Sequence, residues 1–198
     1  MRDGENIRQL CALRPTYMGF IFFQASKRNA CDMPVGNVAS VPEDIEKVAV
    51  FVNETTDAIL AVCRRYGFHT VQLHGSETPE QCRQLRQCGL KVLKAMSISL
   101  ADDFHPCARY EGSVDMFVFD TKCTGFGGSG ERFEHTLLDS YTCSVPFLLS
   151  GGISSEDASM CPLHPQMVGV DVNSRFEIAP GLKDISLLRQ FIPKIKNN

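Results

Sequence analysis

The fold of this chain is decided by four short segments: Val71-Gln72-Leu73-His74-Gly75, Phe119-Asp120-Thr121-Lys122, Ser150-Gly151-Gly152-Ile153 and Asp171-Val172-Asn173-Ser174. Each of them closes a short apolar run with a polar or glycine-rich turn. Side chains presented where strands end and loops begin are typical of a βα barrel, whose active site is built from such ends. We therefore expect one site at the carboxyl ends of parallel strands.

Apolar runs and helical segments alternate along almost the whole sequence, which favours a parallel α/β fold. Several runs are nearly continuous, as in strands that are covered on both faces. Seven strands are expected: Met18–Phe23, Val48–Val52, Thr70–Leu73, Val92–Ala95, Met116–Phe119, Phe147–Leu149 and Val168–Val172. The predicted class is a (β/α)8 TIM barrel, N-terminally truncated so that seven strands are readable, in a single phosphate-binding domain over residues 1–198.

Helices are expected where caps and stop signals flank the remaining segments. Residues 4–13 and 54–66 have helical spacing, and Gly67 ends the second of these. Thr78 is an expected N-cap, with Pro79 at the first helical position and Gln81 completing a capping box. A last helix is expected over 184–191, with Pro193 after it. Residues 30–45 hold two prolines and a glycine, so a loop or one broken turn is expected there.

Composition excludes several classes of protein. The net charge of -3 argues against a nucleic-acid binder, and no apolar run approaches the roughly 20 residues of a membrane span. The polar stretch from Met1 to Asn6 is no signal peptide, so we expect a cytoplasmic protein. The nine cysteines are odd in number and form no C-x-x-C motif, so no metal site is predicted.

Glycine pairs and small polar residues at two successive strand ends favour a phosphate site. Backbone N–H groups of Gly151, Gly152, Asn173 and Ser174 could close around a phosphate, although either turn alone could be a plain turn. Asp120 is a lone carboxylate at the end of a central strand. It is a candidate acid, and the alternative is an aspartate that caps the following loop.

In this order, the segments of the chain resemble strands two to eight of the phosphoribosylanthranilate isomerases, barrel enzymes of tryptophan biosynthesis. The residues that carry the resemblance are Gly19–Phe23 with Ser26-Lys27-Arg28, Val50–Asn53, Val71–Gly75, Phe119–Thr121 with Gly127-Gly128-Ser129-Gly130, Ser150–Ile153, Gly169–Ser174, Glu177 and Pro180–Asp184. The chain departs from the family at Lys27 and Asn29, which replace a proline and an aromatic residue, and at Arg175, which replaces a glycine.

The resemblance implies an Amadori rearrangement of N-(5-phosphoribosyl)anthranilate to the 1-(2-carboxyphenylamino)-1-deoxyribulose 5-phosphate ketose. An acid protonates the furanose ring oxygen and a base removes the proton at C2, so proton transfer suffices and no cofactor is expected. Asp120 is the expected acid, with a pKa raised by desolvation under the loop 123–130. Arg28 is expected to bind the anthranilate carboxylate through a bidentate fork.

The remaining expected site residues contact the substrate. Arg175 could add positive charge to the phosphate site. Gln72, His74 and Asp171 are expected to point into the barrel mouth as substrate-binding groups, and His74 could equally be a structural histidine. The expected partner is therefore a small phosphosugar-anthranilate molecule, bound by a monomer or homodimer.

The family begins with a strand that ends in Lys-x-Cys-Gly, and that strand is absent from this sequence. We therefore expect that Met1 is an internal methionine, and that about ten residues with the first strand and the general-base cysteine are missing. The alternative function is accordingly a truncated, catalytically impaired barrel that still binds phosphorylated ligands. Another alternative, indole-glycerol-phosphate synthase, would need lysine and glutamate at early strand ends, where this chain has Gln24, Asn53 and Gln72–His74.

Overall fold

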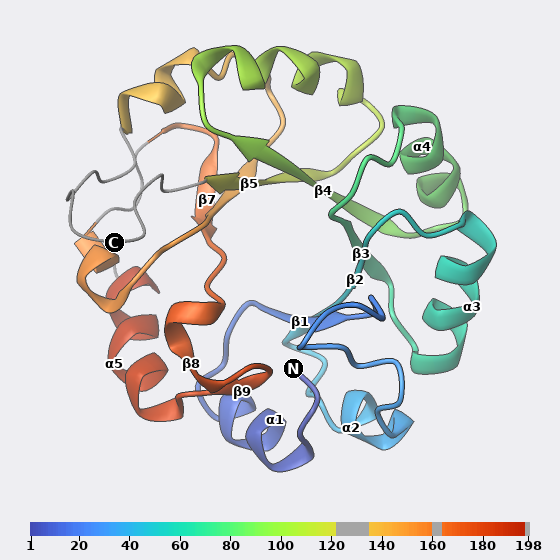
Figure 1. Cartoon of the computed structure of the whole chain (residues 1–198), viewed down its shortest axis with the longest axis vertical. Helices are drawn as coiled ribbons and strands as arrows, with labels where there is room; N and C mark the ends of the chain where they lie inside the picture. Colours follow the sequence, from blue (N-terminus) through green and yellow to red (C-terminus); the bar gives the residue numbers. More distant parts are fainter. Residues whose placement is uncertain (122–134, 160–163, 197–198) are drawn as a thin grey trace.

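The computed structural model of the chain describes residues 1–121, 135–159 and 164–196. Seven parallel strands form one sheet in which each strand pairs with the next along the chain: β1 (Tyr17–Ile21), β2 (Glu46–Phe51), β3 (Thr70–Leu73), β4 (Lys91–Ile98), β5 (Met116–Thr121), β6 (Phe147–Ser150) and β7 (Met167–Val170). Figure 1 shows the sheet curled around a central axis with the helices outside it. This is the α/β architecture of a (β/α)8 barrel, and all seven expected strands are confirmed.

Five α-helices, four 3₁₀ helices and one hairpin complete the described residues. The α-helices are α1 (Gly4–Cys11), α2 (Val35–Ala39), α3 (Thr56–Tyr66), α4 (Pro79–Gln87) and α5 (Ile185–Lys196). The 3₁₀ helices are η1 (Ala101–Tyr110), η2 (His135–Ser140), η3 (Ser155–Ser159) and η4 (Ser174–Phe176), and the hairpin pairs β8 (Glu177–Ala179) with β9 (Leu182–Lys183). The short α2 is the broken turn that the prolines predict.

The capping signals in the sequence act largely as expected. The side chains of Asp3, Thr55 and Thr78 each accept a hydrogen bond from a backbone N–H in the first turn of α1, α3 and α4. Gly67 ends α3 with a φ of 73°, a conformation that favours glycine. Two expectations are wrong. Pro193 lies inside α5, and Gln81 donates its side-chain amide to the carbonyl of Glu54 rather than completing a capping box.

Alternation along the strands decides which side chains face the inside of the barrel. A small inner cluster contains Leu93, Ala95, Met116, Val118 and Leu148, whereas Phe117 and Phe119 belong to the larger core between the sheet and the helices. Because successive residues of a strand point to opposite faces, Asp120 lies on the same face as Val118. By the same argument Gln72 points inward, since Val71 and Leu73 belong to the outer core.

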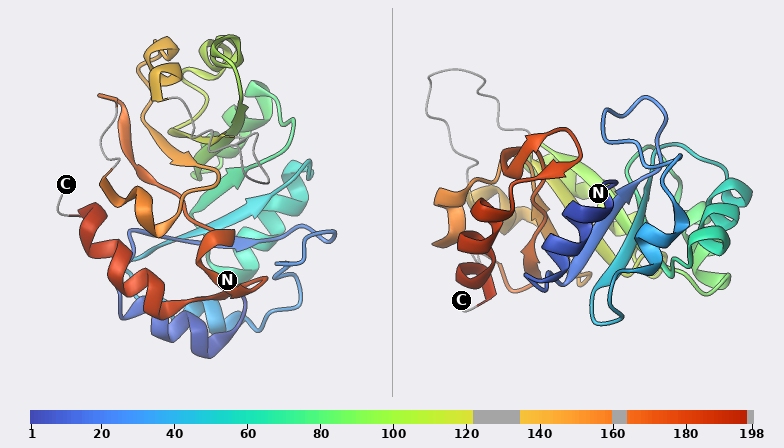
Figure 2. Two further views of the ribbon diagram at one scale, coloured as in Figure 1. Left: turned by 60° about the vertical axis from the view of Figure 1, so that its left-hand side comes forward. Right: turned by 90° about the horizontal axis from the view of Figure 1, so that it is seen from below.

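The first and last helices of the described chain meet at the side of the barrel. Helices α1 and α5 lie side by side in the views of Figures 1 and 2. The buried Asn6 side chain donates to the carbonyl of Lys183 at 2.9 Å and accepts from its N–H at 2.8 Å. These two bonds tie α1 to β9, and they fix the backbone from which the Lys183 side chain enters the site.

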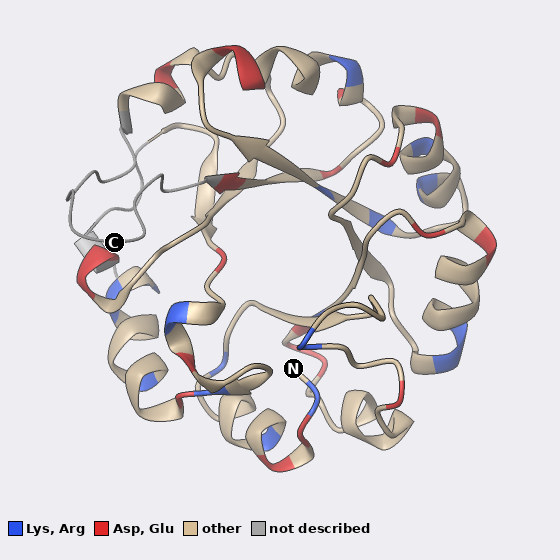
Figure 3. Cartoon of the chain, in the orientation of Figure 1, with Lys and Arg blue, Asp and Glu red and all other residues tan. Residues whose placement is uncertain are grey.

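Charged residues of both signs are mixed over the outer helices, as Figure 3 shows. No helix of the described residues is long and apolar enough to cross a membrane.

Candidate active site

The centre of the candidate site joins β3 and β5 through three of the predicted residues. Nε2 of His74 lies 3.5 Å from Oδ2 of Asp120, and both side chains keep slightly more than a third of their surface exposed. The side-chain amide of Gln72 lies 3.1 Å from Nδ1 of His74. The sequence predicts Gln72 and His74 in the barrel mouth and Asp120 at a strand end, and the structure brings the three into one line with a Gln72–His74 hydrogen bond and a His74–Asp120 ion-pair contact.

Asp171 lies beside this line, at the end of β7. The hydroxyl of Ser150 donates to Oδ2 of Asp171 at 3.1 Å, which joins the ends of β6 and β7. Burial raises the pKa of Asp171, whereas the Ser150 hydrogen bond and the charges of Lys183 and His74 act to lower it. Because Asp120 also acts on this pKa, the charges of Asp120, His74 and Asp171 interact within one site.

The predicted phosphate residues follow the neighbouring strands β6 and β7. Gly151 and Gly152 have φ values of 97° and 63°, a backbone conformation that side chains rarely adopt. Asn173, Ser174 and Arg175 are exposed directly after the end of β7. The two turns therefore lie at the ends of neighbouring strands.

Arg28 lies close to the C-terminal hairpin, and its guanidinium binds a carboxylate of the protein itself. Its Nε and Nη2 donate to Oε2 of Glu177 at 2.8 and 2.6 Å. Glu177 also accepts from Lys183 Nζ at 3.3 Å, and Lys183 donates to Oδ1 of Asn173 at 2.7 Å. A chain of charged contacts thus runs from the expected carboxylate-binding arginine to the expected phosphate turn.

Burial acts strongly on this second set of charges. It lowers the pKa of Lys183, although the Glu177 charge partly opposes that effect. For Glu177 burial acts in the opposite direction, but the Arg28 hydrogen bond and the Lys183 charge outweigh it and lower its pKa. Sequence reasoning assigned no site role to Glu177 or Lys183. The available signal was their place in the C-terminal segment that resembles the isomerase family.

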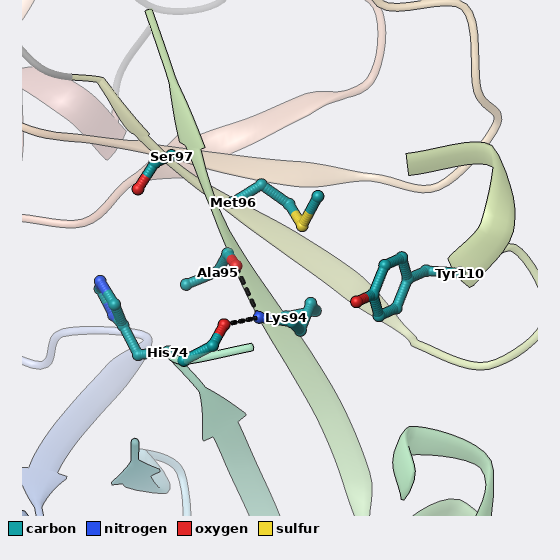
Figure 4. A pocket seen from close by; sticks show the side chains of 7 residues that line it. His74, Lys94, Ala95, Met96, Ser97 and Tyr110 are labelled. Atoms are coloured by element: carbon teal, nitrogen blue, oxygen red, sulfur yellow. Dashed lines mark hydrogen bonds between the residues drawn. The ribbon is translucent and has the colours of Figure 1, made fainter. Parts of the chain in front are cut away.

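A buried ion pair also supports the loop that carries His74. Nζ of Lys94 lies 3.3 Å from Oε2 of Glu77, and the two side chains are 2% and 0% exposed. Lys94 also donates to the carbonyls of Leu73, Gly75 and Ala95 at 3.2, 2.7 and 2.9 Å. Figure 4 shows the Lys94 ammonium between two of these carbonyls, with the imidazole of His74 off to one side. Burial lowers the pKa of Lys94, against the charge of Glu77.

The same loop approaches the end of β2 so closely that one position requires glycine. A Cβ on Gly75 would lie 2.3 Å from Oδ1 of Asn53, while Glu77 accepts from the N–H groups of Asn53 and Gly75 at 2.8 and 2.9 Å.

Beside the loop lies a cavity of about 200 Å³, lined by His74, Gly75, Lys94, Ala95, Met96, Ser97 and Tyr110.

The loop 123–130, which was expected to desolvate Asp120, lies outside the described residues. Within the described residues, no group of three or more histidine, cysteine, aspartate or glutamate side chains could hold a metal ion.

Comparison with known proteins identifies similar sequences and structures over nearly the whole chain. A family model described as "N-(5'phosphoribosyl)anthranilate (PRA) isomerase" matches residues 1–194. The N-(5'-phosphoribosyl)anthranilate isomerase of Parabacteroides distasonis is 44% identical over 98% of this chain and 90% of its own length.

Two solved structures extend the comparison to three dimensions. A phosphoribosyl anthranilate isomerase in complex with reduced 1-(o-carboxyphenylamino)-1-deoxyribulose 5-phosphate is 26% identical, with a TM-score of 0.82 over 100% of this chain and 96% of its own. A monomeric form of the dimeric Thermotoga maritima enzyme is 27% identical, with a TM-score of 0.80 over the same shares. The expected loss of a general-base cysteine is not borne out by these matches.

Proposed function

The chain belongs to the family of N-(5'-phosphoribosyl)anthranilate isomerases, and we propose that Asp120 is the general acid of its reaction. The protein is an isomerase of tryptophan biosynthesis, which converts the aminoaldose N-(5-phosphoribosyl)anthranilate into the corresponding aminoketose phosphate. The observation that carries the assignment of Asp120 is its position at the barrel mouth, with His74 at 3.5 Å and Asp171 close enough to interact with it electrostatically.

The first chemical step needs a proton on the furanose ring oxygen. As the O–H bond of the Asp120 carboxyl breaks, that proton moves to the ring oxygen and the bond between C1 and this oxygen opens. The anthranilate nitrogen supplies the electron pair that forms the C1–N double bond. A base then takes the C2 proton, and the electron pair of the C1–N double bond returns to nitrogen to give an enolamine. Its enol hydroxyl loses a proton while C1 gains one, which forms the ketone, so each bond change is coupled to a proton transfer.

We assign binding of the substrate phosphate to Gly151, Gly152, Asn173, Ser174 and Arg175. Support comes from the adjacent glycine and Asn-Ser turns, and from the Lys183 ammonium, which is 2.7 Å from Oδ1 of Asn173. Positive charge and free backbone N–H groups are the features that phosphate sites share.

The aromatic half of the substrate is assigned to the loop that follows β1. Arg28 is proposed to bind the anthranilate carboxylate; within the described residues its Nη1 makes no hydrogen bond, while Glu177 holds the rest of the guanidinium. Gln72, His74 and Asp171 are proposed to contact the sugar between the two anchors.

We further propose that residues 1–198 form one phosphate-binding barrel domain that acts in the cytoplasm as a monomer or homodimer. The net charge of -3 supports a small-molecule partner rather than a nucleic acid. The dimeric state named for the Thermotoga maritima relative supports the homodimer. Light scattering of the purified chain distinguishes the two states.

The assignment of Asp120 is tested with Asp120→Asn. Because the amide cannot supply the acid proton, kcat should fall by about 10²–10⁴-fold. Binding of the reduced aminoketose phosphate, measured by calorimetry, should change little. Asp44→Asn is the matched control, since Asp44 is an exposed residue that precedes β2 at the opposite end of the barrel. An Asp120→Asn variant with the turnover of the parent would remove Asp120 from the acid role.

A further inference from the structure

We propose that Gln72 is a positioning residue that fixes the tautomer of His74, so that the Nε2–H of His74 stabilises the carboxylate that forms on Asp120. The inference rests on the proposed role of Asp120 as the acid. It adds two functions to that role: a hydrogen-bond donor aimed at the product of the proton transfer, and a second residue that orients this donor.

The tautomer follows from the hydrogen-bonding chemistry of the two side chains. The nitrogen of the Gln72 amide carries two hydrogens and can only donate, and it lies 3.1 Å from Nδ1 of His74. Nδ1 must therefore accept, and in a neutral imidazole the single hydrogen then resides on Nε2. Nε2 is the atom that lies 3.5 Å from Oδ2 of Asp120.

Burial restricts the side chain of Gln72, and backbone contacts hold the loop that carries His74. Gln72 is only 9% exposed, and its register neighbours are Val50 on β2 and Leu93 on β4. The backbone N–H of His74 donates to the carbonyl of Phe51 at 2.8 Å. The next residue, Gly75, is held by Lys94 and Glu77. The backbone of His74 is thus fixed, and the amide of Gln72 decides which imidazole nitrogen faces Asp120.

The donor acts at the moment when charge develops. When the Asp120 carboxyl gives its proton to the ring oxygen, a carboxylate is left that needs a hydrogen-bond donor. The Nε2–H of His74 lies on the side of Oδ2 and can supply that bond without itself losing a proton. A donor aligned in advance stabilises the transition state more than a solvent molecule that must first reorient.

The tautomer is measured directly by ¹⁵N NMR of the histidine-labelled protein at alkaline pH, where an ordinary imidazole is neutral. His74→Gln identifies the signals. We expect a protonated Nε2 and an unprotonated Nδ1 in the parent chain. Gln72→Glu replaces the donor by an acceptor and should move the proton to Nδ1, and Gln72→Met should give a mixture of both tautomers. Gln81→Met is the matched control, because its amide donates to a backbone carbonyl at the surface.

Turnover completes the test. Gln72→Glu should lower kcat by about 10-fold or more, a larger factor than any change in KM, since the misdirected imidazole no longer donates to the transition state. Gln72→Met should show a smaller loss and Gln81→Met none. A parent spectrum with the proton on Nδ1 overturns the inference, as does a tautomer change with unaltered kcat. Failure of Asp120→Asn to lower kcat would instead remove the acid assignment, and the spectra would still decide the geometry of Gln72 and His74.

Discussion

Two buried lysine–glutamate pairs lie at the barrel mouth, and they have different surroundings. Nζ of Lys94 and of Lys183 each lies 3.3 Å from a carboxylate oxygen, of Glu77 and Glu177 respectively. Burial lowers the pKa of both lysines. Lys94, however, faces the helix layer between two residues of the inner cluster, and its other partners are backbone carbonyls.

Lys183 shares its glutamate with Arg28 and donates to Asn173, so the second pair joins the two proposed anchors of the substrate. The same ion-pair chemistry therefore serves two purposes. The pair around Lys94 stabilises a loop, and the pair around Lys183 places charge where a ligand is expected. The two pairs differ in what else the lysine contacts: backbone carbonyls for Lys94 and the side chain of Asn173 for Lys183. This difference can be tested.

The largest expected effect is on stability, from Lys94→Met. The variant leaves the Glu77 carboxylate buried without its cation and three carbonyls without their donor. Breaking a buried pair from one side costs about 3–5 kcal/mol, so the free energy of unfolding in urea should fall by about that amount. Adding Glu77→Gln removes the unpaired charge and should restore part of the loss. A double variant no more stable than Lys94→Met would contradict the stabilising role of the ion pair.

Lys183→Met should affect binding more than stability. Its loss withdraws the positive charge beside Asn173, and we expect about a 10-fold higher Kd for the reduced aminoketose phosphate, on the scale of a charge-assisted hydrogen bond. Calorimetry measures this directly. Lys27→Met, which removes an exposed lysine next to Arg28, is the control for net charge. If Lys183→Met binds as tightly as Lys27→Met, the second pair has only a structural role.

The smallest expected effect is on the pH dependence of stability. Because the pKa of Glu177 is held below its usual 4.5 in the folded chain, its contribution is fully present above that value and is lost as pH falls through the lower folded value. The free energy of unfolding of Glu177→Gln should therefore fall less steeply with decreasing pH than that of the parent. Urea denaturation at several acidic pH values measures this pH dependence. The same dependence in both proteins would contradict the assignment.

Several features of the fold could be predicted because they depend on neighbours in the sequence. Apolar runs placed all seven strands, and Thr78 and Gly67 marked helix ends through local hydrogen bonds and φ. Pro193 was misjudged for a tertiary reason: α5 packs Leu188 and Phe191 into the core before the proline and Ile195 against the core after it, so packing on both sides favours a continued helix.

The sequence by itself determined which side chains reach the barrel mouth, because alternation along a strand fixes the face on which Gln72 and Asp120 lie. Only the tertiary structure decided what these and other polar groups meet there. Arg28 and Glu177 are 149 positions apart, and no local pattern predicts that the arginine fork closes on this carboxylate. Burial explains the other charge contacts at the barrel mouth. A charge that is taken out of water needs a partner, and only the fold brings such partners together.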